Sequence, residues 1–229
     1  MIMHVAERAL QARLVSRVIV ATDDNRIADS VRAGGFEAVM TSPGCRSGTD
    51  RVAEVAAGLD TEIVVNVQGD EPLIDPGTID AAIRPLLDDR SIQVSTSSEP
   101  ITDPEDVFSP AVVKVVCDRQ GFALLFSRSP IPYFRTSSGT GLTEALRQDL
   151  AVLSNYRKHS GLYVYRRAFL EEFTNMETTR LEALEALEQL RALENGVRIR
   201  VVEVNHRSIG VDTKDDYERV KRLMEEDLQ

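Results

Sequence analysis

At residues 64–72 the chain reads Val-Val-Asn-Val-Gln-Gly-Asp-Glu-Pro, an apolar, β-branched run that ends in two carboxylates and a proline. Apolar residues that do not alternate with polar ones are typical of a buried strand in a parallel sheet, and we predict such a strand here. Asp70 then lies where the strand leaves the sheet. Ligands of open α/β sheets bind beyond the carboxyl ends of the strands, so Asp70 is a candidate site residue. An ordinary turn acid explains the same position.

The composition bounds the size and the class of the protein. A chain of 229 residues with 42% hydrophobic residues can bury one large α/β core, or a core with a smaller appended lobe. The formal net charge of −10 argues against a nucleic-acid partner or an anionic membrane surface, because both need clustered Lys and Arg. The longest apolar runs are strand-length, and charged residues near the N-terminus interrupt any signal-peptide core. We therefore expect a cytoplasmic protein with no membrane span.

Helices and strands alternate along the first half of the chain. The predicted strands cover 18–21, 36–40, 63–67 and 92–96, and the predicted helices cover 2–14, 24–33, 52–59 and 76–87. Residues 112–116 and 122–126 then predict an antiparallel hairpin. The segment 127–158 lacks clear periodicity, and segments of that length are usually functional or mobile. Further predicted elements are strands 159–165 and 197–204, a helix over 167–173 and a last helix after residue 213.

A helix predicted over 176–195 has an unusual leucine pattern. Five leucines recur at every third position: Leu181, Leu184, Leu187, Leu190 and Leu193. At about 100° per residue they sweep roughly 240° around a helix axis, which is more than one flat sheet can cover. We therefore expect this helix to be contacted on more than one side, by a second lobe or by a dimer partner.

Two acids that follow strands suggest metal chemistry. Mg²⁺ is typically held by one or two carboxylates, while water and substrate phosphates complete its shell. Asp70 and Asp212 suit that role, and the bound ion would polarise a triphosphate for in-line attack by a sugar hydroxyl. Asp212 can equally be a capping residue of the last helix together with Thr213.

Six motifs, taken in order, resemble the 3-deoxy-manno-octulosonate cytidylyltransferase (CMP-KDO synthetase) family over nearly the whole chain. They are Val20-Ala21-Thr22-Asp23, Ser47-Gly48-Thr49-Asp50-Arg51, Val65 to Pro72, Phe126-Ser127-Arg128 with Ile131-Pro132, Leu187 to Arg191, and Gly210-Val211-Asp212-Thr213. The resemblance implies an α/β fold of the nucleotide-diphospho-sugar transferase type, with a Rossmann-like mixed sheet. It implies one nucleotidyltransferase domain over residues 1–229, with a smaller antiparallel lobe at about 96–167 that makes a homodimer. The implied reaction transfers CMP from CTP to the acidic sugar KDO, for lipopolysaccharide biosynthesis.

The resemblance also implies residues that act on the metal and the nucleotide. Asp70 and Asp212 match the family's magnesium ligands, and Gln68 lies beside the metal in the same motif. Arg51 matches an arginine that faces the substrates. Without the resemblance, Arg51 would be an exposed residue in the first turn of a helix.

A second set of residues is implied for the sugar. His159 and Tyr163 occupy the family's His-x-Gly-x-Tyr pattern on a strand that edges the sugar pocket, and Glu188 and Gln189 match residues that bind sugar hydroxyls. The carboxylate of KDO should also meet a guanidinium, because arginine forms a two-pronged hydrogen-bonded pair with that group. The candidates, which the sequence does not rank, are Arg51, Arg128 and Arg135.

The chain departs from the family at its N-terminus. Members of the family begin with an apolar strand and a loop of the type Pro-Ala-Arg-x-x-Ser-x-Arg-Leu-Pro-Gly-Lys-Pro-Leu, which wraps the triphosphate. Here residues 1–5 align with the helix that follows that loop. We therefore expect the chain as it stands to transfer CMP slowly or not at all, and we expect the flanks of the strands beginning at Val18 and Ile63 to lack a partner strand.

Three functions remain open at the level of sequence. The first is the cytidylyltransferase, with KDO favoured over another acidic sugar such as sialic acid by Glu188, Gln189 and His159. The second is a non-catalytic truncated paralogue or fragment that keeps the fold and the dimer surface. The third is a dinucleotide-dependent dehydrogenase, which the alternation of strands and helices permits. It is disfavoured because no Gly-x-Gly-x-x-Gly follows any predicted strand.

Overall fold

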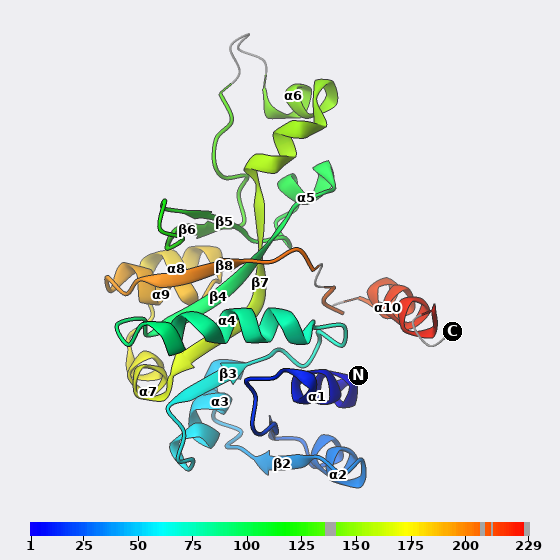
Figure 1. Ribbon diagram of the computed structural model, residues 1–229, viewed down its shortest axis with the longest axis vertical. Helices are drawn as coiled ribbons and strands as arrows, with labels where there is room; N and C mark the ends of the chain where they lie inside the picture. The colour runs from blue at the N-terminus through cyan, green and yellow to red at the C-terminus, as the bar shows by residue number, and fades with distance from the viewer. Residues whose placement is uncertain (136–140, 207–208, 212, 227–229) are drawn as a thin grey trace.

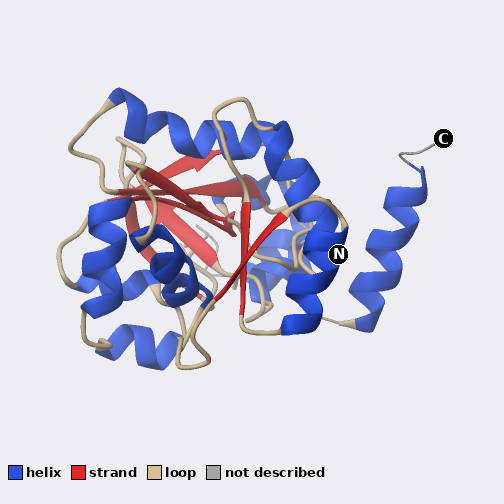
Figure 2. Cartoon of the chain, turned by 90° about the horizontal axis from the view of Figure 1, so that it is seen from below, coloured by secondary structure: helices blue, strands red, loops and turns tan. Residues whose placement is uncertain are grey.

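The computed structural model describes residues 1–135, 141–206, 209–211 and 213–226 (Figure 1). These residues form a mixed α/β fold, in which helices lie on both sides of a central sheet (Figure 2). The predicted fold class is therefore confirmed.

The central sheet has six strands in the order β6-β5-β7-β4-β8, with β3 also paired to β7. They are β3 (Ile63–Asn66), β4 (Val94–Pro100), β5 (Lys114–Cys117), β6 (Ala123–Ser127), β7 (Arg157–Arg166) and β8 (Ile199–Glu203). The ten-residue β7 pairs antiparallel with β3, β4 and β5, whereas β4 and β8 are parallel. β5 and β6 form the predicted antiparallel hairpin. The sheet is therefore mixed.

The prediction that β3 is a buried strand of a parallel sheet is wrong. Its apolar run indicated a buried strand of a parallel sheet, but β3 pairs antiparallel with β7, and three of its four residues are only half-buried. The physical reason is long-range. β7 returns from the far end of the molecule and runs against β3, and the residues of β3 carry no signal of that partner.

A separate two-stranded parallel sheet holds β1 (Ile19–Thr22) and β2 (Glu37–Met40). Within the described part of the chain, β2 is the strand paired with β1 and β7 is the strand paired with β3. The expectation that β1 and β3 each have one flank without a partner strand stays a prediction. α3 (Gly48–Ala57) contacts both sheets, through β1 and β3, and α1 (Ile2–Gln11) contributes to apolar clusters on both, whereas α2 (Asn25–Ala33) connects β1 to β2 within the small sheet.

Two apolar clusters cover the two faces of the central sheet. On one face, α1 and α4 (Pro76–Asp88) contribute Val5, Ala9, Ile79 and Leu86 to a cluster that includes Val164 of β7. On the other face, α3 and α7 (Arg167–Asn175) pack on the alternate residues of β7. Consecutive residues of a strand point to opposite faces, so one strand supplies both cores.

The helix predicted over 176–195 is instead two short helices, α8 (Arg180–Glu185) and α9 (Gln189–Glu194). The chain breaks at Ala186, which adopts the left-handed conformation with φ 50°. The break buries Leu187 and Leu190 and leaves Leu184 71% exposed. One straight helix could not have buried all the leucines on one sheet, and the turn changes which of them face the core.

A small lobe, defined here as residues 101–112, 130–135 and 141–156, extends from one end of the central sheet (Figure 1). It contains α5 (Pro104–Phe108), α6 (Leu142–Gln148) and the 3₁₀ helix η1 (Leu150–Asn155), so the segment predicted to lack periodicity is partly helical. The lobe has an apolar cluster of its own around the fully buried Tyr156, whose hydroxyl donates to the carbonyl oxygen of Pro132 at 2.9 Å. The lobe limits of about 96–167 and the single domain over 1–229 stay predictions.

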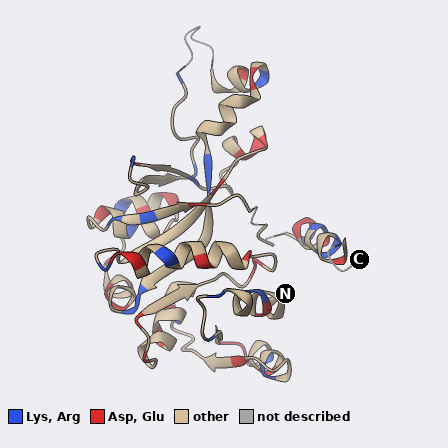
Figure 3. Cartoon of the chain, in the orientation of Figure 1, with Lys and Arg blue, Asp and Glu red and all other residues tan. Residues whose placement is uncertain are grey.

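The last helix, α10 (Lys214–Glu226), lies at the side of the molecule (Figure 1). Acidic and basic residues are mixed along it, as they are along α4 (Figure 3). The segment before α10 matters for the site, because it passes the loop that follows β3.

Candidate active site

The end of β3 meets the start of α3 and the start of α9. Asn66 lies opposite Tyr163 of β7, and its side-chain amide donates to Thr49 Oγ1 at 3.4 Å. Thr49 in turn donates its hydroxyl to Glu188 Oε2 at 2.8 Å. The hydroxyl of Tyr165 also bonds to Thr49, and burial followed by the charge of Glu188 raises the pKa of Tyr165. One hydrogen-bonded network therefore joins β3, α3, β7 and the start of α9.

Gln68 lies between this network and a bulge in β7. The β4–β7 pairing shifts between Thr96 and Ser98. Gly161 lies in the bulged segment of β7, and a Cβ on it would lie 3.3 Å from Gln68 Cγ. A Cβ on Gly48, the first residue of α3, would lie 3.7 Å from Gln68 Oε1. The predicted site residue Gln68 is therefore positioned by the bulge on one side and by α3 on the other.

Asp70 is half-buried in the loop after β3. Its carbonyl oxygen accepts a hydrogen bond from the backbone N–H of Val211 at 2.9 Å. Asp212 lies outside the described residues, but its neighbour Val211 is thus bonded to Asp70. The two segments that carry the predicted magnesium ligands meet at this backbone bond.

The donors at this place suit a magnesium ion. No group of three or more His, Cys, Asp and Glu able to hold a metal occurs among the residues that the structure describes. Mg²⁺ does not need such a group, because it retains several waters and takes one or two carboxylates together with substrate phosphates. Asp70, a hard oxygen donor beside the segment that contains Asp212, fits a sparse ligand set of this kind.

Arg51 lies where β1 and β2 end. Its guanidinium pairs with Asp23 at 2.7 Å and donates to Thr41 Oγ1 at 2.9 Å, and its side chain is 22% exposed. Asp23 follows β1 and Thr41 follows β2. Arg51 thereby links α3 to the small sheet, at the carboxyl ends of both of its strands.

His159 and Tyr163 are neighbours on β7, with ring centroids 5.3 Å apart. Burial lowers the pKa of His159 to about 3, so its imidazole is neutral near pH 7. Burial also raises the pKa of Tyr163, whose hydroxyl oxygen is buried and has no hydrogen-bond partner among the described residues. Buried polar groups are usually satisfied, so a hydroxyl of this kind is a ready partner for a ligand.

The other two candidate arginines differ in their surroundings. Arg128 donates to the carbonyl oxygens of Glu185 at 2.7 Å, Pro110 at 2.8 Å and Ala186 at 3.3 Å. It therefore secures the left-handed turn between α8 and α9. Arg135 is exposed in the small lobe.

The turn at Ala186 directs the start of α9 towards β7. Glu188 is the residue before α9 and accepts the hydrogen bond from Thr49, while Gln189 is the first residue of α9 and is buried. The structure therefore brings Gln68, Tyr163, Glu188 and the end of β3 into one neighbourhood. Arg51 lies further along α3, beside the small sheet.

Sequence reasoning missed three members of the network: Thr49, Asn66 and Tyr165. Thr49 and Asn66 lie inside motifs that already carried the family resemblance, so a polar residue at each position was a usable signal. Tyr165 had none, because an aromatic residue in a strand is ordinary core material. Its role follows from the contact with Thr49.

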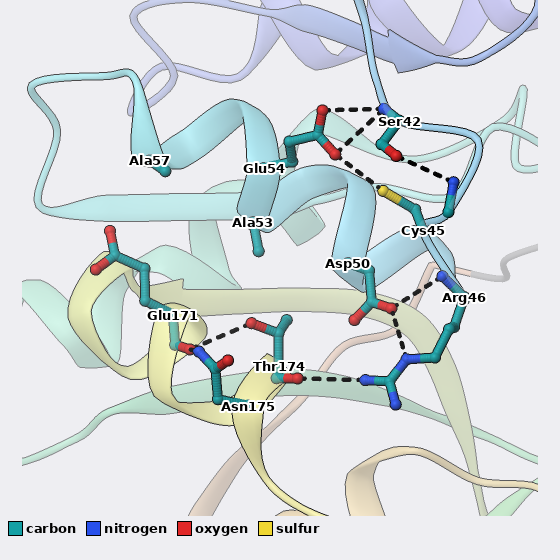
Figure 4. Close-up of a pocket in the computed structure, with 11 residues that line it drawn as sticks. Ser42, Cys45, Arg46, Asp50, Ala53, Glu54, Ala57, Glu171, Thr174 and Asn175 are labelled. Carbon is teal, nitrogen blue, oxygen red and sulfur yellow. Dashed lines mark hydrogen bonds and ion pairs between the residues drawn. The ribbon is translucent and has the colours of Figure 1, made fainter.

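A depression of about 450 Å³ lies between α3 and α7 (Figure 4). In it, Glu54 accepts from the backbone N–H of Ser42 at 2.9 Å and from Cys45 Sγ at 3.1 Å, and Arg46 donates to Asp50 at 3.3 Å. Burial and then Glu54 raise the pKa of the Cys45 thiol. These polar groups bond to one another, and we assign no ligand to the depression.

No helix within the described residues has both the length and the apolar character that crossing a bilayer requires.

Comparison with known proteins agrees with this geometry. The cytidylyltransferase family matches residues 1–199. A 3-deoxy-manno-octulosonate cytidylyltransferase of Geobacter sulfurreducens is 54% identical over 220 residues, covering 96% of this chain and 87% of the relative. The corresponding protein of Geotalea daltonii is 56% identical, covering 96% of this chain and 86% of the relative.

Solved structures give the same result. A CMP:2-keto-3-deoxy-manno-octonic acid synthetase complexed with CTP superposes with a TM-score of 0.87 at 39% identity, covering 99% of this chain and 88% of the other. A 4-diphosphocytidyl-2C-methyl-D-erythritol synthase of Anaerococcus prevotii has a TM-score of 0.60 at 11% identity, covering 98% of this chain and 89% of the other, and shares the fold.

The mixed sheet, together with the family match over residues 1–199, defines a protein of the cytidylyltransferase class. Relatives more than half identical over nearly the whole chain narrow that class. The chain belongs to the 3-deoxy-manno-octulosonate cytidylyltransferase family.

Proposed function

We propose that this protein transfers CMP from CTP to KDO and releases pyrophosphate, for lipopolysaccharide biosynthesis. The observation that carries the proposal is the meeting of the loop after β3 with β7 and the start of α9. Gln68, Tyr163 and Glu188, which match substrate-binding positions of the family, converge there. The names of the relatives reported above specify the same sugar.

In the proposed reaction, a hydroxyl oxygen of the sugar bonds to the α-phosphorus of CTP while the bond to the pyrophosphate oxygen breaks. The hydroxyl proton leaves to solvent, and the charge of the triphosphate has to be neutralised. Asp70 and Asp212 would hold Mg²⁺, which would supply part of that neutralisation. Gln68, positioned between Gly48 and Gly161, would orient the groups bound beside Asp70.

The sugar is recognised through its hydroxyls and its carboxylate. Glu188 offers carboxylate acceptors, Gln189 offers both a donor and an acceptor, and the buried hydroxyl of Tyr163 lacks a partner among the described residues. Of the three candidate arginines, Arg51 is paired with Asp23 and Arg128 is bonded to three carbonyls. Arg135 is exposed in the small lobe, and all three arginines stay candidates for the sugar carboxylate.

The test is pyrophosphate release from CTP with KDO and Mg²⁺, repeated with sialic acid in place of KDO. Asp70→Asn should reduce turnover by about 100-fold or more, the scale of losing one electrostatic contact at the reacting groups. Asp29→Asn, on the 77%-exposed acid of α2, is the matched control and should keep full activity. Turnover with sialic acid alone, or normal turnover of Asp70→Asn, would overturn the proposal.

The same proposal includes slow turnover by residues 1–229 on their own. Phosphates are usually neutralised by cations and backbone amides, and both Arg51 and Arg128 are already engaged within the described structure. A chimera that adds the family's N-terminal strand and loop should transfer CMP at least about 100-fold faster, the scale of one lost donor. Equal rates from the two proteins would contradict this part of the proposal, and the chimera also serves in the assay above.

The proposal further includes a homodimer in the cytoplasm, formed through the small lobe. Two large apolar side chains of the lobe support it: Tyr133 is 83% exposed and Leu150 is 63% exposed. A second copy of the chain would remove that surface from water. Sedimentation at micromolar concentration should show a dimer, and a monomer at every concentration would count against it.

A further inference from the structure

Thr96 of β4 lies in the centre of the sheet, and its side chain is fully buried. It pairs with Tyr163 in the ladder and is the last paired residue before the bulge in β7. Its hydroxyl makes two close contacts, 2.6 Å to the carbonyl oxygen of Leu162 and 2.9 Å to Nε2 of His159. A more distant contact of 3.4 Å reaches the carbonyl oxygen of Ser160.

Proton accounting decides the direction of these bonds. A threonine hydroxyl has one proton to donate, whereas a carbonyl oxygen can only accept. The 2.6 Å contact therefore requires Thr96 to donate to Leu162. The hydroxyl is then an acceptor towards the imidazole, so Nε2 of His159 must carry a proton and donate it to Thr96.

A neutral imidazole has one N–H and one unprotonated nitrogen. Burial lowers the pKa of His159 to about 3, so the ring carries only the Nε2 proton near pH 7. Nδ1 is then a hydrogen-bond acceptor, and no group among the described residues bonds to it. Phe126 lies edge-on to the ring with centroids 4.9 Å apart, and Tyr163 lies at 5.3 Å, so aromatic neighbours hold the ring plane.

We propose that Thr96 is a positioning residue that fixes His159 as the Nε2–H tautomer and thereby presents Nδ1 as an acceptor for one hydroxyl of the acceptor sugar. The part concerning the sugar rests on the proposed function, whereas the tautomer does not. Thr96 does not touch the substrate and acts through the imidazole. The pairing explains why a threonine, and not an apolar residue, occupies a fully buried position in a central strand.

The first arm of the test is NMR of protein labelled with ¹⁵N-histidine, without substrate. The chain has three histidines, and His159→Gln identifies the signal of His159. We expect Nδ1 to resonate as an unprotonated nitrogen and Nε2 as a protonated one, unchanged between pH 6 and pH 8. A protonated Nδ1, or a doubly protonated ring near pH 7, would overturn the inference whatever the activity of the enzyme.

The second arm compares substitutions at and beside Thr96. Thr96→Val keeps the shape and removes the hydroxyl, Thr96→Ser restores it, and Ser97→Ala removes a neighbouring buried hydroxyl that has no partner within the described residues. Thr96→Val should mix the two tautomers and raise the KM for KDO about 3–10-fold, the worth of one hydrogen bond, with the KM for CTP unchanged. Thr96→Ser and Ser97→Ala should keep the tautomer and the KM of the original protein.

The outcomes separate the inference from the proposed function. If the tautomer is as expected but the chimera that carries the family's N-terminal strand and loop forms no CMP-KDO, the proposed function fails and the positioning of His159 stands. If CMP-KDO forms and Thr96→Val changes both KM values equally, or neither, the positioning of the sugar through Thr96 is wrong. Should Thr96→Val fail to fold, the tautomer of the unsubstituted protein and the KM of Thr96→Ser still decide the case.

Discussion

Gly161 and Glu71 approach each other so closely that no larger residue fits at Gly161 without movement. A Cβ on Gly161 would lie 3.1 Å from Glu71 Oε1. The bulge of β7 and the loop after β3 are therefore in direct contact at this glycine.

Gly161→Ala should lower kcat/KM by about 10-fold. The new methyl group displaces Glu71 or Gln68 by a few tenths of an ångström, and a displacement of about 1 Å near the reacting groups can cost about 100-fold. Gly141→Ala is the matched control, because a Cβ there meets nothing within 4 Å. Unchanged kinetics of Gly161→Ala would show that the contact has no bearing on the reaction.

Lys114→Met should destabilise the protein by about 2–4 kcal/mol, because buried carbonyls without a partner cost about 1–3 kcal/mol each. The ammonium of the fully buried Lys114 donates to the carbonyl oxygens of Ser109, Val112 and Arg128 at 2.6–2.9 Å. Urea unfolding measures the change, and the exposed Lys221→Met is the control. Equal stability of the two variants would contradict the role of Lys114 as an anchor of the lobe.

The buried ion pair of Glu182 with Arg191 leads us to expect that the protein is less stable in acid. Desolvation is the largest single influence and raises the pKa of Glu182. The hydrogen bonds from Arg191 and from the backbone of Thr179, together with the nearby arginine charges, outweigh it, so the net pKa lies below the ordinary value of 4.5. A lowered folded-state pKa stabilises the fold above the unfolded value, and this contribution is lost as the pH falls through the folded value. The free energy of unfolding should therefore fall below about pH 4.5.

Glu182→Gln checks the source of this acid dependence. Breaking the buried pair with Arg191 should cost about 3–5 kcal/mol at pH 7, and the variant should lose less stability than the original protein when the pH is lowered. Glu62→Gln is the control, because Glu62 is exposed although it also pairs with an arginine, Arg166. If the free energy of unfolding fell equally with pH in Glu182→Gln and in the original protein, the acid dependence would come from groups other than Glu182.

Leu150→Asp tests the dimer through the small lobe. A carboxylate placed in an apolar contact loses its hydration, so the dimer Kd should rise by about 10-fold or more. Leu87→Asp, a comparably exposed leucine at the end of α4, should leave the Kd unchanged. An equal dimer Kd for the two variants would show that Leu150 does not lie in the dimer interface.

Local patterns predicted most strands to within one or two residues, since each is a short β-branched or apolar run between turn residues. They failed where the answer depended on distant partners. The direction of β3 is set by β7, and the break at Ala186 occurs at a residue that favours helices and gives no stop signal. The candidate site shows the same limit of local sequence patterns. The motifs indicated Gln68 and Glu188, whereas Tyr165 became part of the site only through its contact with Thr49.

The division into two sheets has a consequence for local unfolding. Within the described residues, no backbone ladder joins β1 and β2 to the central sheet, and the ion pair of Arg51 with Asp23 links the small sheet to α3. Fewer shared hydrogen bonds mean a smaller free energy for opening that part alone. Amide protons of β1 should exchange with solvent sooner than those of β4, which has a strand on each side. We therefore expect the small sheet, which Arg51 of α3 contacts through Asp23 and Thr41, to open at a lower free energy than the central sheet.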